Sequence, residues 1–488
     1  MSRLIIVSNR VSGNRPDRHT AGGLSTGLSS WLKKKGGIWF GWSGNVGNDN
    51  TDLHIKTDTA SGITYATIDL DEEEYKGYYH GFANSTLWPC FHFRTDHLRF
   101  DPKAYETYRH VNEKWAQLLK DKLRPDDLIW VHDYHLIPFA RCCREIGIQN
   151  KIGFFLHIPF PPAEIFAHIP CGDELLLDLC HYELVGFHTE SYRQSFQRSL
   201  SLLSHCHHPS TGLPAGVSYS VETGVFPMGI DILEIQNHAV STEKQLQPRH
   251  HTHPIVISVD RLDYSKGLLE RLNGYEHFLE RYASLARKFS YLQIIPDCRL
   301  ENPVYQSLRK NLQLRIKHIN DRFSILRPHP VRYINKTLPR EDVAYLLREA
   351  SAGLITPMCD GMNLLAKEFV AAQNPLDPGV LILSRFAGAA KELNAALLIN
   401  PMDKTAVASA LKKALTMPIK ERRQRHGELM KSLQQNPVER WAHDFLHKLR
   451  YPAKRTELRQ PAPFHDIQPL RIQRPTVQGV SYAQRYNA

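Results

Sequence analysis

The sequence predicts an α/β protein built from two doubly wound, Rossmann-like domains. Short, continuous apolar runs recur along the chain and are separated by stretches with helical periodicity, the pattern of parallel sheets covered on both faces. The runs form two series, and a polar, turn-rich segment from about Asp231 to Pro254 separates them. A chain of 488 residues is also too long for one core and suits two domains of about 200 residues each.

We therefore expect a first domain over 1–232, a second over 233–449 whose last helix packs back on the first domain, and a ligand-binding cleft between them. A disordered basic tail is expected over 450–488, which is rich in Pro, Arg and Gln and has little periodicity. The expected strands of the first domain are RLIIVSN, GIWFGWSG, DLIWVHD, KIGFFLHIP and ELVGFHT, and those of the second are PIVISVD, SYLQIIPD, AGLITPM, GVLILSR and ALLINP.

Composition and charge exclude several classes of protein. No apolar run approaches the roughly 18 residues needed to span a bilayer, and the N-terminal apolar run is too short for a signal peptide, so we expect a cytoplasmic protein without membrane contact. The eight cysteines have no disulfide framework spacing. The net charge of +11 is spread out rather than gathered in one stripe, so no nucleic-acid partner is expected. The histidine-rich tracts at 205–208 and 249–253 lack a spaced partner pair, so we expect no metal and no cofactor.

Polar residues that follow the apolar runs are the candidate ligand contacts, because ligands of open parallel sheets bind beyond the carboxyl ends of the strands. Asp133 and His157 follow two consecutive runs of the first series. A lone histidine beside a strand is more often structural, but two neighbouring strand ends weaken that interpretation. Gly22 and Gly23 open a predicted helix and would let backbone N–H groups approach an anion; a plain helix-entry turn is equally consistent with them.

Three cations follow strands of the second series. Arg261 and Lys266 lie at a strand-to-helix turn, where a guanidinium, an ammonium and a helix N-terminus together suit a diphosphate. The alternative is an interdomain salt bridge. Arg299 follows the next predicted strand and suits a separate phosphate.

The segment PMCDGMNLLAKEFVAAQ holds the remaining candidates. A buried strand breaks at Cys359 to Gly361, and a helix begins near Asn363 and carries Lys367 and Glu368 without the spaced partners of a solvated helix face. We therefore expect both charges to be satisfied from outside the helix. Asp360 lies at the strand end, and the N–H groups of Met362, Asn363, Leu364 and Leu365 could hold a diphosphate.

Together, SNR, AGGL, WFGWSG, LWPCFH, HDYHL, FFLHIPFP, RLDYSKG and DGMNLLAKEFVAAQ resemble the trehalose-6-phosphate synthase family, retaining glycosyltransferases of the GT-B fold. The likeness runs in order from Arg3 to about residue 445. It implies transfer of glucose from UDP-glucose to glucose 6-phosphate without a metal or cofactor. A separate trehalose-phosphate phosphatase would follow in the pathway, and a homo-oligomer is expected.

The resemblance also implies residue roles. It makes the first domain the acceptor-binding one and the second the nucleotide-sugar-binding one. Catalytic roles fall on His157, Asp360, Arg261 and Lys266. Donor contacts fall on Gly22, Gly23, Arg261, Lys266, Leu338, Asp360, Gly361, Met362, Asn363, Leu364, Leu365 and Glu368, and acceptor contacts on Arg10, Tyr79, Trp88, Asp133 and Arg299.

Two alternatives remain on the same scaffold. One is an enzyme that glycosylates a different acceptor, such as a cyclitol phosphate, and the other is a non-catalytic sensor of sugar phosphates. The donor base, UDP, GDP or ADP, is also open, because Met358 and Cys359 occupy a position that varies between relatives.

Overall fold

The apolar runs form the strands of two sheets. The computed structural model describes residues 3–11, 28, 31–32, 36–47, 55–205, 220–245, 254–326 and 328–452. The predicted tail beyond Pro452, the pair Gly22 and Gly23, and most of both histidine-rich tracts lie outside these residues. All ten predicted runs are strands, each within a few residues of its expected bounds.

The first sheet has eight strands in the order β3-β4-β2-β1-β5-β6-β7-β8. Neighbours pair in parallel except β3, which forms an antiparallel edge against β4. Three of these strands were not predicted: β3, β4 and β8. The bounds are β1 (Leu4–Arg10), β2 (Gly37–Val46), β3 (Lys56–Ala60), β4 (Ile63–Leu70), β5 (Leu128–His132), β6 (Lys151–Phe155), β7 (Leu184–Phe187) and β8 (Glu222–Val225).

The second sheet has six strands, all parallel, in the order β11-β10-β9-β12-β13-β14. In chain order this is 3-2-1-4-5-6, the order of a doubly wound dinucleotide-binding sheet. The bounds are β9 (Ile255–Val259), β10 (Ser290–Ile294), β11 (Val331–Ile334), β12 (Ala350–Ile355), β13 (Val380–Ser384) and β14 (Leu397–Ile399).

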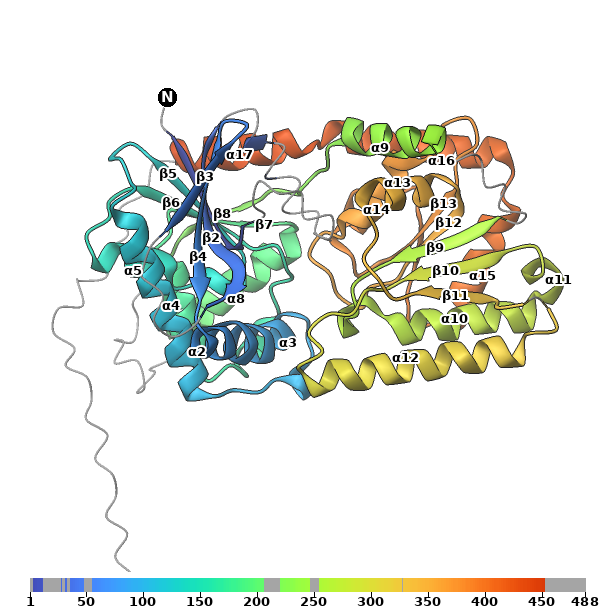
Figure 1. Cartoon of the computed structure of the whole chain (residues 1–488), viewed down its shortest axis with the longest axis horizontal. Coiled ribbons are helices and arrows are strands. Elements are labelled where there is room, and N and C mark those ends of the chain that lie inside the picture. Colours follow the sequence, from blue (N-terminus) through green and yellow to red (C-terminus); the bar gives the residue numbers. More distant parts are fainter. Residues whose placement is uncertain are drawn as a thin grey trace, which may run out of the picture. The chain divides into compact units, whose positions relative to one another are not determined.

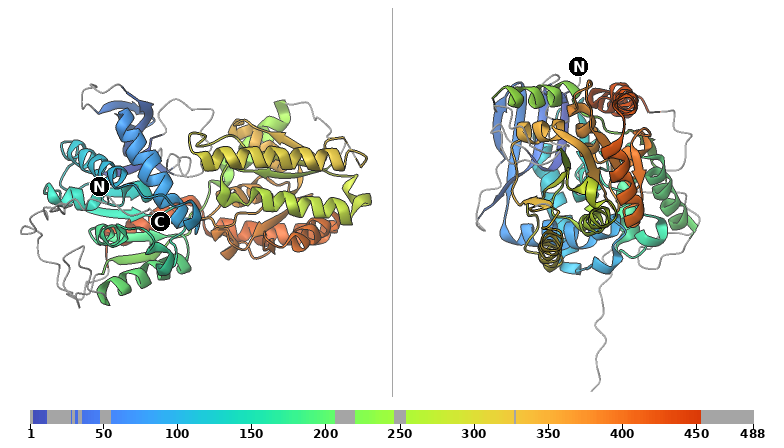
Figure 2. Two further views of the ribbon diagram at one scale, coloured as in Figure 1. Left: turned by 90° about the horizontal axis from the view of Figure 1, so that it is seen from below. Right: turned by 90° about the vertical axis from the view of Figure 1, so that its right-hand side faces the viewer.

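Helices cover both faces of each sheet (Figures 1 and 2). On the first sheet one apolar layer includes Val111 and Trp115, and the other includes Trp441 and Phe445. The helical segments along this part of the chain are α2 (Glu72–Glu74), η1 (Tyr75–Leu87), α3 (Trp88–Phe91), η2 (Thr95–His97), α4 (Pro102–Lys120), η3 (Tyr134–Leu136), α5 (Phe139–Glu145), α6 (Ala163–Phe166), α7 (Gly172–Leu179) and α8 (Glu190–His205).

The second sheet carries separate apolar layers on its two faces, one containing Phe369 and the other containing Phe278. The segments are α9 (Ile232–Gln245), η4 (Tyr264–Lys266), α10 (Leu268–Arg281), α11 (Ala283–Ala286), α12 (Pro303–Arg322), α13 (Arg340–Arg348), α14 (Leu364–Ala372), η5 (Gly388–Lys391), α15 (Lys404–Thr416), α16 (Ile419–Gln435) and α17 (Val438–Arg450).

Helices α9 and α17 lie where the chain passes from one sheet to the other, and the apolar runs alone did not indicate on which sheet each helix packs. The segment predicted to be polar and turn-rich after Asp231 contains α9, whose Ile235 and Ala239 are buried in the second sheet's core. Helix α17 follows α16 on the second sheet, yet its Trp441 and Phe445 pack in the core of the first sheet against Trp130 (Figure 1). The chain therefore passes between the sheets twice.

Candidate active site

The second sheet places a lysine and a carboxylate at its topological switch point. Strands β9 and β12 are neighbours there, and their connections leave in opposite directions, which opens a ligand site beyond their carboxyl ends. Lys266 follows β9 and Asp360 follows β12. Lys266 Nζ lies 2.5 Å from Asp360 Oδ2, and both side chains are mostly buried. A charge pair therefore occupies the position where the sequence predicted a diphosphate clamp.

Asn363 shapes the loop that carries Asp360. Its backbone has a φ of 69°, in the left-handed region that non-glycine residues seldom adopt. In this conformation its Oδ1 accepts the Ala366 N–H and caps α14, while its Nδ2 donates to Asp360 Oδ2 at 2.9 Å. Burial alone would raise the pKa of Asp360, but the Lys266 charge and these hydrogen bonds outweigh it and lower the pKa. Asp360 is thus an ionised carboxylate at the start of a helix.

Asp133 and His157 lie together at the carboxyl ends of β5 and β6. The His157 N–H donates to Asp133 Oδ1 at 3.1 Å, and Asp133 has a φ of 77°. Such strain in a non-glycine residue typically costs about 1–3 kcal/mol and gathers at functional sites. Burial raises the pKa of Asp133 to about 7. Burial also lowers the pKa of His157 well below its ordinary value, so its ring is neutral.

The two strand-end groups meet at Gly361. A Cβ added to this glycine would lie 1.9 Å from the His157 carbonyl oxygen, so the backbones touch and only glycine fits. Tyr192 of α8 adds a second contact, because its hydroxyl donates to the Asp360 carbonyl oxygen at 2.8 Å. Strand ends of both sheets therefore contribute to one site, and Tyr192 was not among the residues predicted to belong to it.

Two predicted cations share one tryptophan ring. The Arg299 guanidinium lies 4.2 Å and the Arg261 guanidinium 5.8 Å from the Trp88 ring centroid. Arg299 also donates to the Tyr305 hydroxyl at 2.9 Å and lies 3.5 Å from Asp263 Oδ2. For Arg261, the structure shows no ion pair with a carboxylate of the described residues. Among the described residues, neither Arg261 nor Lys266 thus forms the interdomain salt bridge that was the alternative, since Lys266 pairs with Asp360 of the same sheet.

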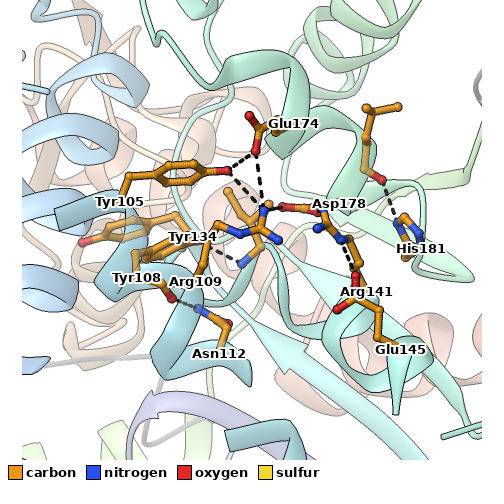
Figure 3. Close-up of polar contacts among 12 residues, drawn as sticks. Tyr105, Tyr108, Arg109, Asn112, Tyr134, Arg141, Glu145, Glu174, Asp178 and His181 are labelled. Carbon is orange, nitrogen blue, oxygen red and sulfur yellow. Dashed lines mark hydrogen bonds and ion pairs between the residues drawn. The ribbon is translucent and has the colours of Figure 1, made fainter. Parts of the chain in front are cut away.

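A polar network fixes the loop after β5, from which Asp133 and Tyr134 project. Figure 3 shows the contact of Asn112 with Tyr108 and, separately, the buried Asp178, which lies between Arg109 and Arg141. The Tyr108 hydroxyl donates to the Tyr134 carbonyl oxygen at 2.8 Å and accepts the Ile137 N–H at 3.2 Å. Arg299 Nη2 in turn donates to the Tyr134 hydroxyl at 3.4 Å, so the position of this loop and the position of the Arg299 side chain depend on each other.

Arg10 and Tyr79 are the other predicted acceptor contacts. They lie near an aromatic group that also includes Tyr75, His135, Tyr134 and Trp88. The Tyr79 ring stacks on Tyr75 with centroids 5.7 Å apart and on His135 with centroids 5.9 Å apart. Burial and then the charge of Glu301 raise the pKa of Tyr75, while the exposed Arg10 opposes this shift. Arg10 is therefore close enough to act on the ring that stacks with Tyr79.

Both charges of helix α14 find partners outside the helix, as predicted. Lys367 is buried and pairs with Glu392, its Nζ lying 2.6 Å from Oε2. Glu368 Oε1 lies 3.4 Å from Arg340 Nη2 on α13. Burial, with the nearby Glu234, raises the pKa of Glu368, and Arg340 opposes this rise. Arg340 was missed because no sequence spacing relates it to α14.

The remaining predicted donor contacts are apolar. Met362 is buried, and Leu338, Leu364 and Leu365 are partly buried against the same core of the second sheet. Leu338 lies two residues before Arg340, at the entrance to α13. Among the described residues, no group of three His, Cys, Asp or Glu side chains is arranged to hold a metal. In the same part of the chain, no helix is both long and apolar enough to cross a membrane.

Comparison with known proteins identifies the family. The model of glycosyltransferase family 20 matches residues 3–451. The chain belongs to this family. A trehalose-6-phosphate synthase of Sodalis glossinidius is 43% identical over 464 residues, which cover 94% of this chain and 98% of that protein. This family 20 chain is thus a relative of trehalose-6-phosphate synthases, as its motifs predicted.

Solved structures give the same result. A UDP-forming α,α-trehalose-phosphate synthase from Burkholderia xenovorans, in complex with glucose 6-phosphate, has a TM-score of 0.87 and 43% identity over 92% of this chain and 100% of that one. An E. coli structure bound with UDP-2-fluoro glucose has a TM-score of 0.85 and 42% identity over 93% of this chain and 100% of that one. The family 20 chain therefore has the GT-B fold that the sequence predicted.

Proposed function

We propose that this family 20 chain transfers glucose from UDP-glucose to glucose 6-phosphate with retention of configuration, yielding α,α-trehalose 6-phosphate and UDP. The observation that carries the proposal is the junction at Gly361, which brings Lys266 and Asp360 of the second sheet against Asp133 and His157 of the first. A donor bound beyond β9 and β12 of the second sheet would meet an acceptor bound beyond β5 and β6 of the first.

We assign the donor diphosphate to Arg261, Lys266 and the N-terminus of α14. Arg261 has no carboxylate partner within the described residues, so its charge is available to a phosphate. Lys266 would exchange part of its contact with Asp360 for the diphosphate. The first N–H groups of a helix lack intrahelical acceptors and carry the positive end of its dipole, which favours an anion there. Glu368, held beside Arg340, is assigned to the ribose hydroxyls.

We assign the donor glucose to Asp360 and His157, and the acceptor to the aromatic group of the first sheet. Trp88 and Asp133 would contact the acceptor sugar. Arg299, Arg10 and Tyr79 would contact its phosphate. Arg299 is only 6% exposed and already paired with Asp263, so this assignment requires the phosphate to share the guanidinium with Asp263.

The chemistry follows from charge placement. As the bond between the anomeric carbon and the phosphate oxygen breaks, the cations and the helix N-terminus stabilise the charge that develops on UDP, a preorganised electrostatic effect. A double displacement would use a second carboxylate about 5 Å from the first. Asp360 is instead tied to Lys266 and Asn363. We infer transfer on one face, with the departing phosphate oxygen accepting the acceptor hydroxyl proton as the new glycosidic bond forms.

The proposal is tested by the rate of UDP release from UDP-glucose, measured with and without glucose 6-phosphate and repeated with GDP-glucose and ADP-glucose. Release that requires glucose 6-phosphate is the expected result. Release with a cyclitol phosphate in its place would identify a different acceptor. Tight binding of glucose 6-phosphate without release from any donor would identify a sensor.

Several wider assignments belong to the same proposal. We assign the acceptor domain to 1–232, the donor domain to 233–449 and a basic tail to 450–488. The product carries a phosphate, so a separate trehalose-phosphate phosphatase is the natural next enzyme. We also propose a cytoplasmic location for the chain, in keeping with its proposed sugar-phosphate and nucleotide-sugar substrates. We also propose a homo-oligomer, which light scattering of the purified protein would test.

A further inference from the structure

Lys367 is a buried cation in the helix that the proposed function assigns to the donor. Its side chain is 1% exposed, and its ammonium donates to two acceptors, the Met228 carbonyl oxygen at 2.7 Å and Glu392 Oε2 at 2.6 Å. A buried lysine is rare and persists only where its charge is compensated. Neither acceptor belongs to α14, so the ammonium fastens this helix to two other segments of the chain.

These contacts lead to the two segments where the chain passes between the sheets, to 226–231 directly at Met228 and to 436–437 through Glu392. Met228 lies between β8 of the first sheet and α9 on the second. Glu392 Oε1 accepts from Asn436 Nδ2 at 2.8 Å, and Asn436 lies between α16 on the second sheet and α17 on the first. The two passages also touch directly, because a Cβ added to Gly229 would lie 2.1 Å from the Asn436 carbonyl oxygen.

Glu392 is also continuous with the backbone that supports the Asp360 loop. The Asp360 N–H donates to the Phe386 carbonyl oxygen at 3.3 Å, and the Ala389 N–H donates to the Met362 carbonyl oxygen at 2.7 Å. A Cβ added to Gly388 would lie 1.9 Å from the Gly361 carbonyl oxygen. The segment from Phe386 to Glu392 thus connects the loop at the donor site with the Lys367 ion pair.

The Lys367 charge also acts on the first sheet. His188 follows β7, and its pKa is lowered to about 3 by burial and then by the charge of Lys367. The His188 ring packs against His157, with ring centroids 5.5 Å apart. The ammonium therefore acts on His188, which packs against the histidine assigned to the donor glucose.

We propose that Lys367 is a positioning residue for glucosyl transfer. It holds the donor-site helix α14 in a fixed position against both passages between the sheets, through Met228, Glu392 and Asn436. The inference rests on the proposed function, since it assumes that α14 binds the donor. Without this ammonium, α14 would lose its link to both passages, and the Asp360 loop would be held against the first sheet only by the contacts at Gly361 and Tyr192. The site would then be misaligned for UDP-glucose, while the acceptor contacts on the first sheet would be retained.

The test compares Lys367→Met with Lys114→Met by steady-state kinetics, UDP titration calorimetry and thermal unfolding. Lys114 is a matched control: its Nζ lies 2.6 Å from Glu74 Oε1, its side chain is 17% exposed, and it is remote in sequence from α14 and from both passages. For Lys367→Met we expect the KM for UDP-glucose and the Kd for UDP to rise about tenfold or more, which corresponds to about 1.4 kcal/mol of binding. The KM for glucose 6-phosphate should change less than threefold.

Asn436→Ala provides a milder variant, because it removes one hydrogen bond from a half-buried side chain. It should shift the same two constants in the same direction by a smaller factor, and it decides the question if Lys367→Met does not fold. If both variants lose stability as Lys114→Met does while the UDP-glucose KM and UDP Kd stay at wild-type values, Lys367 is only structural and the inference is wrong. If wild-type protein binds no UDP, the proposed function fails instead.

Discussion

Substituting Gly361 with alanine should separate the two halves of the site. A Cβ at this position would lie 1.9 Å from the His157 carbonyl oxygen, whereas an ordinary contact needs about 3.4 Å. The Asp360 loop and the His157 strand end must therefore move apart by about 1.5 Å. A displacement of about 1 Å in an active site can cost about 100-fold in rate, so we expect kcat of Gly361→Ala to fall by about 100-fold. Overpacking should lower the free energy of unfolding by about 1–3 kcal/mol.

The assay is UDP release at saturating UDP-glucose and glucose 6-phosphate, accompanied by denaturant unfolding. Gly427→Ala is the matched control, because an added Cβ there meets nothing within 4 Å and the residue is exposed in the middle of α16. It should keep wild-type kcat and gain about 1 kcal/mol of stability from helix propensity. A kcat for Gly361→Ala within threefold of wild type would refute the close junction between the strand ends.

The other predictions concern charges at the site. Lys266→Ala should reduce kcat by on the order of 100-fold, because a preorganised donor to the developing UDP charge is lost. Single-turnover rates would check this, and near-normal turnover would show that Lys266 does not bind the diphosphate. Arg299→Ala should raise the KM for glucose 6-phosphate about tenfold, with the KM for UDP-glucose nearly constant; the reverse pattern would place Arg299 at the donor. Asp133 has a pKa of about 7 in the folded protein, against about 3.9 for an ordinary aspartate, so its stabilising contribution is present below about pH 4 and is lost as the pH rises through 7. Thermal unfolding between pH 4 and 8 should therefore show wild type losing stability relative to Asp133→Asn, and parallel profiles would contradict this.

The strands and their polar ends could be predicted because they depend on local sequence. A continuous apolar run such as DLIWVHD can be buried on both faces only as an interior strand, and the polar residue that ends it must lie at the sheet edge. Asp133, His157, Lys266 and Asp360 could be placed at the carboxyl ends of their strands in this way. Local sequence also placed the start of α14, since Asn363 is the N-cap that the pattern indicated. Strands β3, β4, β8 and β11 carried no such signal, because none of them is a continuous apolar run.

Contacts between distant segments could not be predicted in this way. The return of the last helix to the first domain was expected, but not the residues that receive it; the structure packs Trp441 and Phe445 of α17 against Trp130. The partner of Glu368 is Arg340, which is 28 residues away on another helix. The left-handed backbone of Asn363 and of Asp133 was also unforeseen, because neither is a glycine and tertiary contacts enforce it.

The reaction itself is tested most directly by identifying the sugar that forms when purified protein is supplied with UDP-glucose and glucose 6-phosphate. The product should be examined by mass and by the coupling of both anomeric protons. We expect a phosphorylated disaccharide with two small, α-type couplings, formed in equal amount to UDP. A product with one β-type coupling would contradict transfer with retention on one face, and free glucose in place of a disaccharide would contradict an acceptor site at Trp88 and Asp133.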